Sequence, residues 1–258
     1  MSLLSIEKLS KNFDGLQALS EVSLNVEKGQ ITALIGPNGA GKTTLFNIVT
    51  GIDKLSAGKI FYESERIDRL PPYEIAGKGI ARTFQIVKLF KGLSVLENVM
   101  LGRHIRTKAG VAHILGRLPS ARQEELATQE YAMEMLCFVH MEDRAHEIAG
   151  NLPHGQQRLV ELARAMASEP SLLLLDEPSG GLNSHEVLML KKIFNSVQDM
   201  GITIFLIEHD MRLVMGISDK VVVLNYGMKI SEGHPTKVSK DPEVVKAYLG
   251  REFADAPA

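Results

Sequence analysis

One segment of the sequence carries residue types suited to holding phosphate groups. It follows the strand-like run Ile31–Ile35 and fits the P-loop pattern G-x-x-x-x-G-K-[ST], which leads from a strand into a helix. In such a loop, glycines let backbone N–H groups surround phosphate oxygens, the lysine reaches the β- and γ-phosphates, and the hydroxyl binds Mg²⁺. A glycine-rich turn without a ligand is the alternative interpretation. We expect ATP and Mg²⁺ to bind at Gly36, Pro37, Asn38, Gly39, Ala40, Gly41, Lys42, Thr43 and Thr44.

A second segment combines an apolar strand with two acids. The run Leu172–Leu175 reads as a strand of a sheet core, and Asp176 and Glu177 follow it directly. Asp176 is expected to hold Mg²⁺, usually through water. Glu177 is expected to polarise the attacking water as the catalytic base. A strand that simply ends in solvent would explain one acid, but it explains the pair beside a P-loop poorly.

Further motifs stand between and after these two segments. Gln85 ends the run Arg82-Thr83-Phe84-Gln85, the segment 152–158 reads Leu-Pro-His-Gly-Gln-Gln-Arg, the segment 179–183 reads Ser-Gly-Gly-Leu-Asn, and His209 follows the strand-like Thr203–Ile207. In this order the motifs resemble the Q-loop, signature, D-loop and switch histidine of the ABC ATPase family. A single histidine at a strand end would more often be structural, but the order of the motifs favours a functional one.

The resemblance implies roles for these residues. Gln85 would bind Mg²⁺ and sense the membrane subunits, and His209 would stabilise the transferring phosphoryl group. Two such subunits would meet head to tail, so that Gly155 and Gln156 of one contact the ATP held by the P-loop of the other. Phe13 stands where the family has an aromatic that stacks on adenine, although an aromatic there is otherwise more often a core residue.

Longer stretches resemble one branch of the family. The segments 89–99, 207–219, 231–233 and 241–250 look like the ATPase subunits of branched-chain amino-acid importers. This resemblance implies transmembrane permease subunits as partners and, through them, a solute-binding protein. Related ATPases for urea or lipopolysaccharide transport share much of it. From a different class, a soluble ABC ATPase acting on DNA or ribosomes is the rival, and a P-loop kinase is a more distant one.

The signature segment departs from the family pattern L-S-G-G-Q. Pro153 replaces the serine and His154 the first glycine, which removes a hydroxyl and a backbone N–H facing the partner's γ-phosphate. Gly155 and the helix N-terminus behind it keep some capacity to bind an anion. We therefore expect this subunit to complete the weaker of two sites and to work in a heterodimer, with a homodimer as the alternative.

Composition excludes several classes of function. The 29 Lys and Arg residues are balanced by 31 Asp and Glu, so no basic excess points to nucleic acid.

The single cysteine, Cys137, forms neither an internal disulfide nor a cysteine-based metal site, and we expect it to pack on an apolar helix face with Leu126, Met133 and Leu136. No run is long enough to span a membrane and no signal peptide is visible, so we expect any membrane role to come through a partner. Together with the resemblance to transporter ATPases, this implies a peripheral protein on the cytoplasmic face of the inner membrane.

The pattern of elements predicts an α/β fold built on a P-loop core. Two alternating segments, Leu3–Leu9 and Val22–Val26, suggest an antiparallel β part, and a helix is expected from about Lys42 to Thr50. The strands Ile31–Ile35, Leu172–Leu175, Thr203–Ile207 and Val221–Leu224 predict a mostly parallel sheet. Residues 1–87 and 166–258 would form the core, and residues 88–165 a helical subdomain. Within it the basic segment Arg103–Pro119 is expected to be solvated, with lipid headgroups or a membrane partner as the alternative.

Overall fold

The computed structural model describes residues 2–106 and 119–252 and contains two β-sheets. The smaller sheet has the order β2-β1-β4-β5 and is antiparallel where β1 pairs with β2 and β4. Its strands are β1 (Ser2–Phe13), β2 (Leu16–Glu27), β4 (Ala57–Tyr62) and β5 (Glu65–Arg66). The antiparallel part is confirmed, but β1 and β2 are much longer than predicted, because their alternation is interrupted by irregular pairings that hide the period.

The larger sheet has the order β10-β9-β3-β8-β7-β6. All its neighbouring pairs are parallel except β10 with β9, so the mostly parallel sheet is confirmed. Every residue of β3, β7 and β8 is buried, which explains their nearly continuous apolar sequences. The strands are β3 (Ile31–Ile35), β6 (Ile80–Arg82), β7 (Leu172–Asp176), β8 (Thr203–Ile207), β9 (Lys220–Asn225) and β10 (Met228–Gly233).

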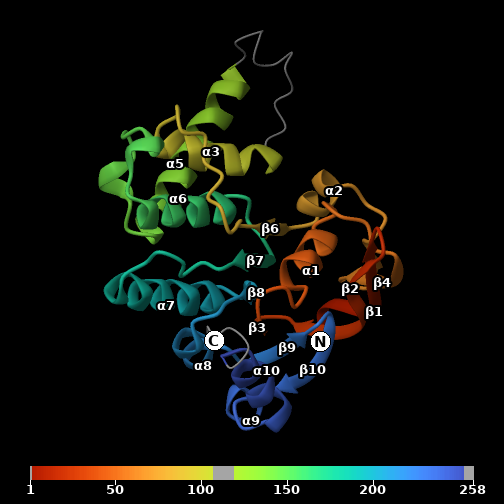
Figure 1. Ribbon diagram of the computed structural model, residues 1–258. Helices are drawn as coiled ribbons and strands as arrows, with labels where there is room; N and C mark the ends of the chain where they lie inside the picture. Colours follow the sequence, from red (N-terminus) through yellow and green to blue (C-terminus); the bar gives the residue numbers. More distant parts are fainter. Residues whose placement is uncertain (1, 107–118, 253–258) are drawn as a thin grey trace.

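The helices fall into two groups around this sheet (Figure 1). One group consists of α3 (Val95–Arg103), α5 (Pro119–Phe138) and α6 (His154–Met166), which lie together away from the antiparallel sheet. These helices fall in the segment predicted to be a helical subdomain, whose boundaries stay a prediction. The other helices are α1 (Lys42–Val49), α2 (Pro72–Gly77), α7 (Ser184–Asp199), α8 (Met211–Ile217), α9 (Pro235–Val238) and α10 (Pro242–Glu252).

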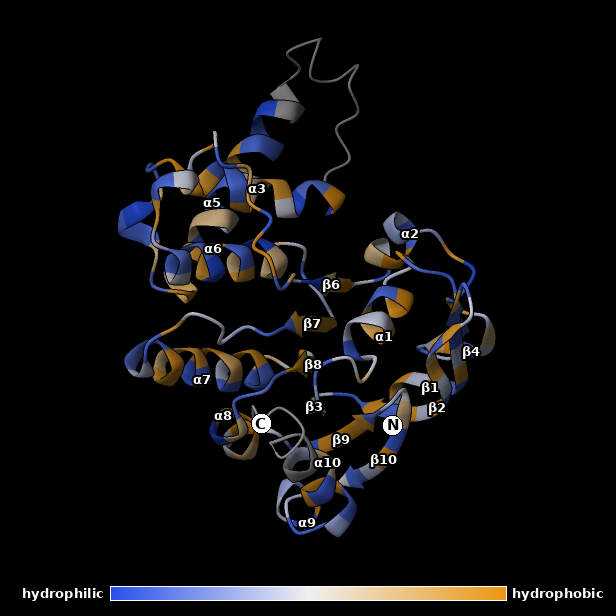
Figure 2. Ribbon diagram, viewed as in Figure 1, coloured by the Kyte–Doolittle hydropathy of each residue, from blue (hydrophilic) through white to orange (hydrophobic). Residues whose placement is uncertain are grey.

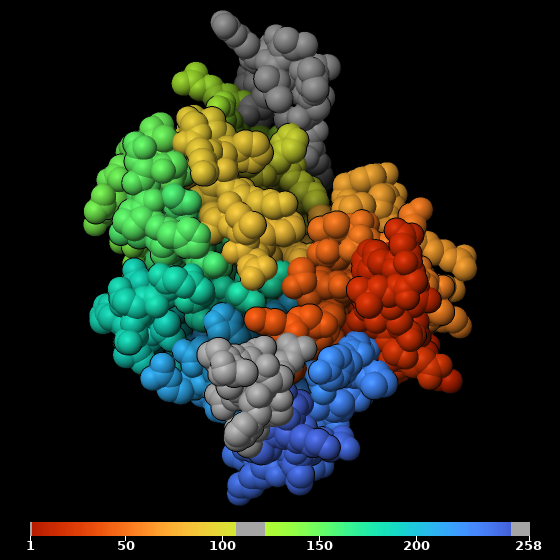
Figure 3. All heavy atoms as spheres, viewed as in Figure 1, coloured from red at the N-terminus to blue at the C-terminus, as the bar shows by residue number. Residues whose placement is uncertain are grey.

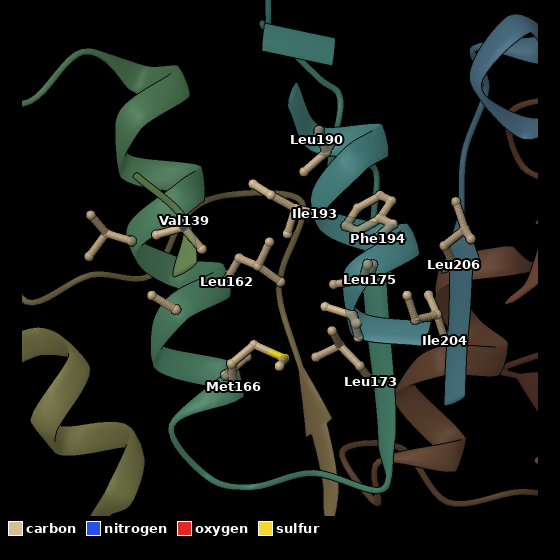
Figure 4. Packing of buried hydrophobic residues seen from close by; sticks show 14 of the residues in the cluster. Val139, Leu162, Met166, Leu173, Leu175, Leu190, Ile193, Phe194, Ile204 and Leu206 are labelled. Carbon is tan, nitrogen blue, oxygen red and sulfur yellow. The ribbon is translucent and has the colours of Figure 1, made fainter. Parts of the chain in front are cut away.

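Alternation along the buried strands joins the two halves of the hydrophobic core. In β7, Leu172 and Leu174 face the antiparallel sheet and α1, whereas Leu173 and Leu175 face α6 and α7. Figure 4 shows the second face, where Leu162 of α6 and Phe194 of α7 lie against β7 and β8. Figure 2 shows the same strands as the most apolar part of the ribbon. Because these strands are packed on both faces, their ends are held in place, and so is the backbone of the residues that directly follow them.

The prediction for Cys137 is wrong, because its thiol is exposed. One step along a helix turns a side chain by about 100°, so a neighbour of a buried residue faces elsewhere. Leu136 is buried, while Leu126 is 52% exposed. The buried face of α5 is made by Thr128, Ala132, Met135 and Leu136, with Met133 partly buried against the core.

The basic segment is only partly visible, since residues 107–118 lie outside the described part of the chain. Of its described arginines, Arg103 pairs with Glu169 at 2.6 Å, and Arg106 donates hydrogen bonds to the backbone carbonyls of Ser168 and Glu169. These two side chains are tied to the end of α6 rather than simply solvated. Within the described ranges, no helix has the length and apolarity that crossing a membrane requires.

Candidate active site

The P-loop runs from β3 into α1 and lies close against two neighbouring strands. A Cβ on Gly36 would lie 2.1 Å from the carbonyl oxygen of Leu224 in β9. Gly41 has a φ of +99°, and its Cβ would lie 2.6 Å from Cδ2 of Leu19 in β2. Neither position accepts a side chain without moving the backbone. The close packing therefore explains why these two residues are glycines.

The first turn of α1 has no side-chain cap. Its N-cap, Gly41, makes no side-chain hydrogen bond, and the first turn contains no acid. The amino group of Lys42 donates hydrogen bonds to the carbonyl oxygens of Gly36 at 2.6 Å and Pro37 at 3.1 Å. An uncapped helix start with a lysine held over the loop is well suited to bind an anion such as a phosphate.

Asp176 lies at the tip of β7 with its carboxylate nearly fully buried. One carboxylate oxygen, Oδ2, accepts a hydrogen bond from Nη2 of Arg82 at 3.1 Å, while the other, Oδ1, is buried and has no hydrogen-bond partner among residues 2–106 and 119–252. Burial raises the pKa of Asp176, and the guanidinium of Arg82 opposes that rise. A buried carboxylate oxygen without a partner fits Mg²⁺, which proteins usually bind through one or two carboxylates together with substrate phosphates.

Three of the residues predicted from the sequence meet beside it. The carboxylate oxygen Oε2 of Glu177 accepts a hydrogen bond from Nε2 of Gln85 at 3.1 Å. Nδ1 of His209 lies 3.8 Å from the same oxygen. Glu177 itself has a φ of +50°, an uncommon conformation for a residue with a side chain. Residues far apart in the sequence thus surround one carboxylate at the ends of β6, β7 and β8.

Glu208 is a buried residue of this region that sequence reasoning missed. Its carboxylate accepts hydrogen bonds from the backbone N–H groups of Ser179 at 2.9 Å, His209 at 2.8 Å and Asp210 at 3.1 Å. It therefore joins the loop after Glu177 to the loop that carries His209. The signal was present, because an acid directly after an apolar strand resembles the pattern at Asp176.

Arg158 of α6 was also missed as a functional residue. Its guanidinium donates hydrogen bonds to the backbone carbonyls of Glu177 at 2.9 Å and Gln85 at 3.0 Å. The helix that carries the signature segment is therefore attached to both. No sequence signal distinguishes Arg158 from an ordinary charged helix residue.

The signature residues lie in a different environment from the P-loop. The helix α6 begins at His154 after Pro153, again without a side-chain cap and without an acid in its first turn. A Cβ on Gly155 would lie 2.8 Å from Cδ2 of Leu182 and 3.2 Å from Oε1 of Glu186, which places it beside the start of α7. The side-chain oxygen of Gln156 is buried without a partner. Neither residue takes part in the contacts described around Asp176 and Glu177.

Phe13 lies at the end of β1, where its side chain is 40% exposed. The amino group of Lys11 lies 4.4 Å from the centre of its ring. An exposed ring at the end of a strand is compatible with stacking on a base, and it is not part of the hydrophobic core.

Comparisons with known proteins agree with this geometry. Residues 19–180 match the family model of ABC transporters, and residues 228–254 match that of branched-chain amino acid ATP-binding cassette transporters. The chain is 42% identical to BraF, a high-affinity branched-chain amino acid transport ATP-binding protein of Pseudomonas aeruginosa, over 96% of this chain and 98% of BraF. It is 41% identical to LivG of Escherichia coli K12, which is described in the same terms, with the same coverage.

A solved structure extends the comparison to the fold. The ADP conformation of MJ1267, an ATP-binding cassette of an ABC transporter, superposes with a TM-score of 0.84 at 34% identity, covering 97% of this chain and 99% of that one. The relatives and this solved structure match the chain over nearly its whole length, and the family model of ABC transporters matches residues 19–180. The chain belongs to the ABC transporter family as one of its ATP-binding cassettes.

Proposed function

We propose that this protein hydrolyses ATP to energise an importer of branched-chain amino acids. The observation that carries the enzymatic part is the meeting of Gln85, Glu177 and His209 at one carboxylate oxygen beside the buried Asp176. The substrate rests on the match of the C-terminal residues 228–254 and on the relatives BraF and LivG.

The residues divide the chemistry between binding and water activation. The backbone of the P-loop and Lys42 hold the phosphates, and Phe13 stacks on the adenine. Thr43, Asp176 and Gln85 would hold Mg²⁺, which would supply positive charge beside the phosphates. Glu177 accepts a hydrogen bond from the attacking water and takes its proton.

His209 adds a donor close to that carboxylate. Its imidazole approaches the same oxygen of Glu177 that Gln85 contacts, and its side chain is 64% exposed. From there it can donate a hydrogen bond to the γ-phosphate as negative charge develops there. Glu208 holds the backbone of His209 and Asp210 and so fixes the direction of the imidazole.

A second ATPase subunit completes each site. The uncapped start of α6, with Gly155 and Gln156, supplies N–H groups to the ATP on the P-loop of the partner. Because Pro153 lacks an N–H and the serine hydroxyl is absent, this chain gives its partner a poorer set of donors. A heterodimer with a partner that carries a fuller signature follows from this.

The permease binds in an open groove on the other side of Gln85. The groove has a volume of about 280 Å³ and contains the exposed Phe90 and Leu101; its lining is Arg82, Phe90, Leu101, Gly102, Arg164, Ala165 and Ser168. Figure 3 shows the segment after β6, in yellow, on the surface between the orange P-loop region and the green and teal helices. A permease helix in this groove holds the chain at the cytoplasmic face of the inner membrane, where an external solute-binding protein delivers the amino acid.

The test is transport by the assembled complex. The chain, its partner ATPase and the permeases are reconstituted in proteoliposomes, and uptake of radiolabelled leucine, isoleucine and valine is measured with ATP. We expect uptake that disappears with Lys42→Ala in this chain, because the γ-phosphate loses its cation. A complex that hydrolyses ATP but transports urea or lipopolysaccharide instead would contradict the substrate. Wild-type hydrolysis by the Lys42→Ala complex would contradict the assignment of the P-loop.

A further inference from the structure

Arg82 occupies an unusual position between the metal ligand and the surface groove. It is the last residue of β6, and its side chain is only 6% exposed. Its Nη2 donates a hydrogen bond to Oδ2 of Asp176 at 3.1 Å, a residue 94 positions further along the chain. The same side chain lines the groove in which Phe90 and Leu101 are exposed. One residue therefore borders both sites.

The guanidinium is held from several sides. Its Nη1 donates to Oδ1 of Asn47 at 2.9 Å and to Oγ1 of Thr50 at 3.1 Å, both at the C-terminal end of α1. The rings of Phe84 and Phe46 lie 4.9 Å and 5.7 Å from its central carbon. These contacts use the planar fork of an arginine, which the single amino group of a lysine cannot reproduce.

The ion pair places the two carboxylate oxygens of Asp176 in different environments. Arg82 fixes Oδ2, while Oδ1 remains buried and without a partner among the described residues. The guanidinium thus orients the carboxylate for a metal and compensates its charge when no metal is bound. Removing that charge would leave a buried carboxylate close to the phosphates of ATP, unless Mg²⁺ supplied a positive charge instead.

We propose that Arg82 is a positioning residue that couples occupancy of the groove to metal binding at Asp176. A permease helix in the groove changes the position of the Arg82 fork, and the fork changes how Asp176 presents Oδ1 to the metal. Since such coupling is reciprocal, metal binding also changes the affinity of the groove for the permease. This inference rests on the proposed function only in taking the occupant of the groove to be a permease helix.

The first experiment tests the connection between Arg82 and the metal in the purified chain. ATP affinity is measured by calorimetry with Mg²⁺ and, separately, with EDTA. For Arg82→Met we expect metal-free ATP binding to weaken by about tenfold or more, and binding with Mg²⁺ to change by less than about threefold. Arg103→Met, which removes a guanidinium paired with Glu169, is the control and should change neither value. Equal weakening in both conditions would overturn the connection.

The second experiment tests the connection between the groove and the metal. The affinity for Mn²⁺ in the presence of ATP is measured by electron paramagnetic resonance, for the free chain and for the complex with permeases. In the wild type, assembly should shift the Mn²⁺ affinity by about fivefold or more. In Arg82→Met the complex should still assemble, but the shift should fall below about twofold.

Arg82→Lys separates charge from geometry and covers the case in which Arg82→Met does not fold. It keeps the positive charge, so metal-free ATP binding should stay within about threefold of wild type, while the shift on assembly should be lost. If no complex with permeases forms, the proposed function fails. If the complex forms and the wild type shows no shift, or the shift persists in Arg82→Lys, the role of Arg82 is overturned while the proposed function stands.

Discussion

The helices α3 and α7 begin differently from α1 and α6. Ser94 and Glu97 form a capping box at the start of α3, and Asn183 and Glu186 form one at the start of α7. In α1 and α6 no side chain caps the first turn. Because the first N–H groups of a helix have no acceptor within it, the first pair satisfies them internally, whereas the second pair presents them to a ligand.

The charges follow the same division. The first turns of α3 and α7 each contain a glutamate, which neutralises the positive end of the helix dipole, while those of α1 and α6 contain no acid. The difference separates helix ends that are stabilised by their own side chains from those that we propose to bind an anion. By this comparison we expect both Lys42, at the start of α1, and Gly155, at the start of α6, to take part in phosphate binding, although they lie in different surroundings.

The largest expected effect comes from removing the catalytic base while leaving both uncapped ends intact. Glu177→Gln should lower ATP turnover by about 10²- to 10⁴-fold, because an amide is a poor base, and ATP should remain bound between the subunits. Turnover by the complex and gel filtration with ATP and Mg²⁺ measure the two effects. Glu147→Gln, at a half-exposed surface ion pair, is the control. A monomer with bound ATP, or unchanged turnover, would argue against Glu177 as the base.

A negative charge placed in the P-loop just before α1 should strongly weaken phosphate binding there. Gly39 has a φ of +76° with open space around its Cβ position, so Gly39→Asp adds a carboxylate without a steric clash. At about 4 Å from a phosphate, repulsion should weaken ATP binding by about a hundredfold or more. Gly29→Asp, with a φ of +71° and equally open space, is the matched control. Equal affinities of the two variants would contradict phosphate binding at this loop.

A signature segment closer to the family pattern should improve phosphate binding at the start of α6. Pro153→Ser with His154→Gly restores a hydroxyl and a backbone N–H, and each hydrogen bond to a charged group contributes about 1.5 to 3 kcal/mol. Turnover at the partner's P-loop site should rise by about tenfold or more. Lys42→Ala in this chain isolates that site. No gain in this background, or two copies of this chain hydrolysing at full rate, would contradict the heterodimer.

The smallest effect is expected at a capped helix. Ser94 accepts a hydrogen bond from the N–H of Glu97, and its own N–H donates to the carboxylate of Glu97 at 2.7 Å. Ser94→Ala should reduce the free energy of unfolding by about 1 kcal/mol. It should leave ATP affinity unchanged, because this helix end binds no phosphate. Thermal unfolding measures the stability and calorimetry the ATP affinity. A loss of ATP affinity at unchanged stability would contradict the distinction between capped and uncapped helix starts.

The sequence predicted well whatever depends on continuous patterns. The buried strands β3, β7 and β8 are nearly pure apolar runs, and the start of α1 follows from the P-loop motif, so their bounds were right within one residue. The short strands β5 and β6 have too few residues to show a period. The exposure of Cys137 was missed because neighbouring residues of a helix face different directions.

The chemical motifs could also be predicted from the sequence, but the residues that hold them in place could not. Glu177 was named from the pair of acids that follows an apolar strand, and Gln85 and His209 were named from the order of motifs; the roles of all three stay predictions. The pairing of Arg82 with Asp176 joins positions 94 residues apart, and Glu208 binds the N–H of Ser179, which is 29 residues away. Such pairs depend on which strands are neighbours in the sheet, and no local pattern records that order.

Hydrogen exchange of backbone amides gives the most direct test that both uncapped helix ends bind one ATP between two subunits. The exchange is measured in the Glu177→Gln complex with its partner, with and without ATP and Mg²⁺. Amides of residues 39–44 and of residues 154–156 should both slow when ATP binds, whereas those at the start of α3, already satisfied by Ser94, should not change. Protection confined to residues 39–44, with unchanged exchange at residues 154–156, would contradict the claim that both helix ends bind one ATP.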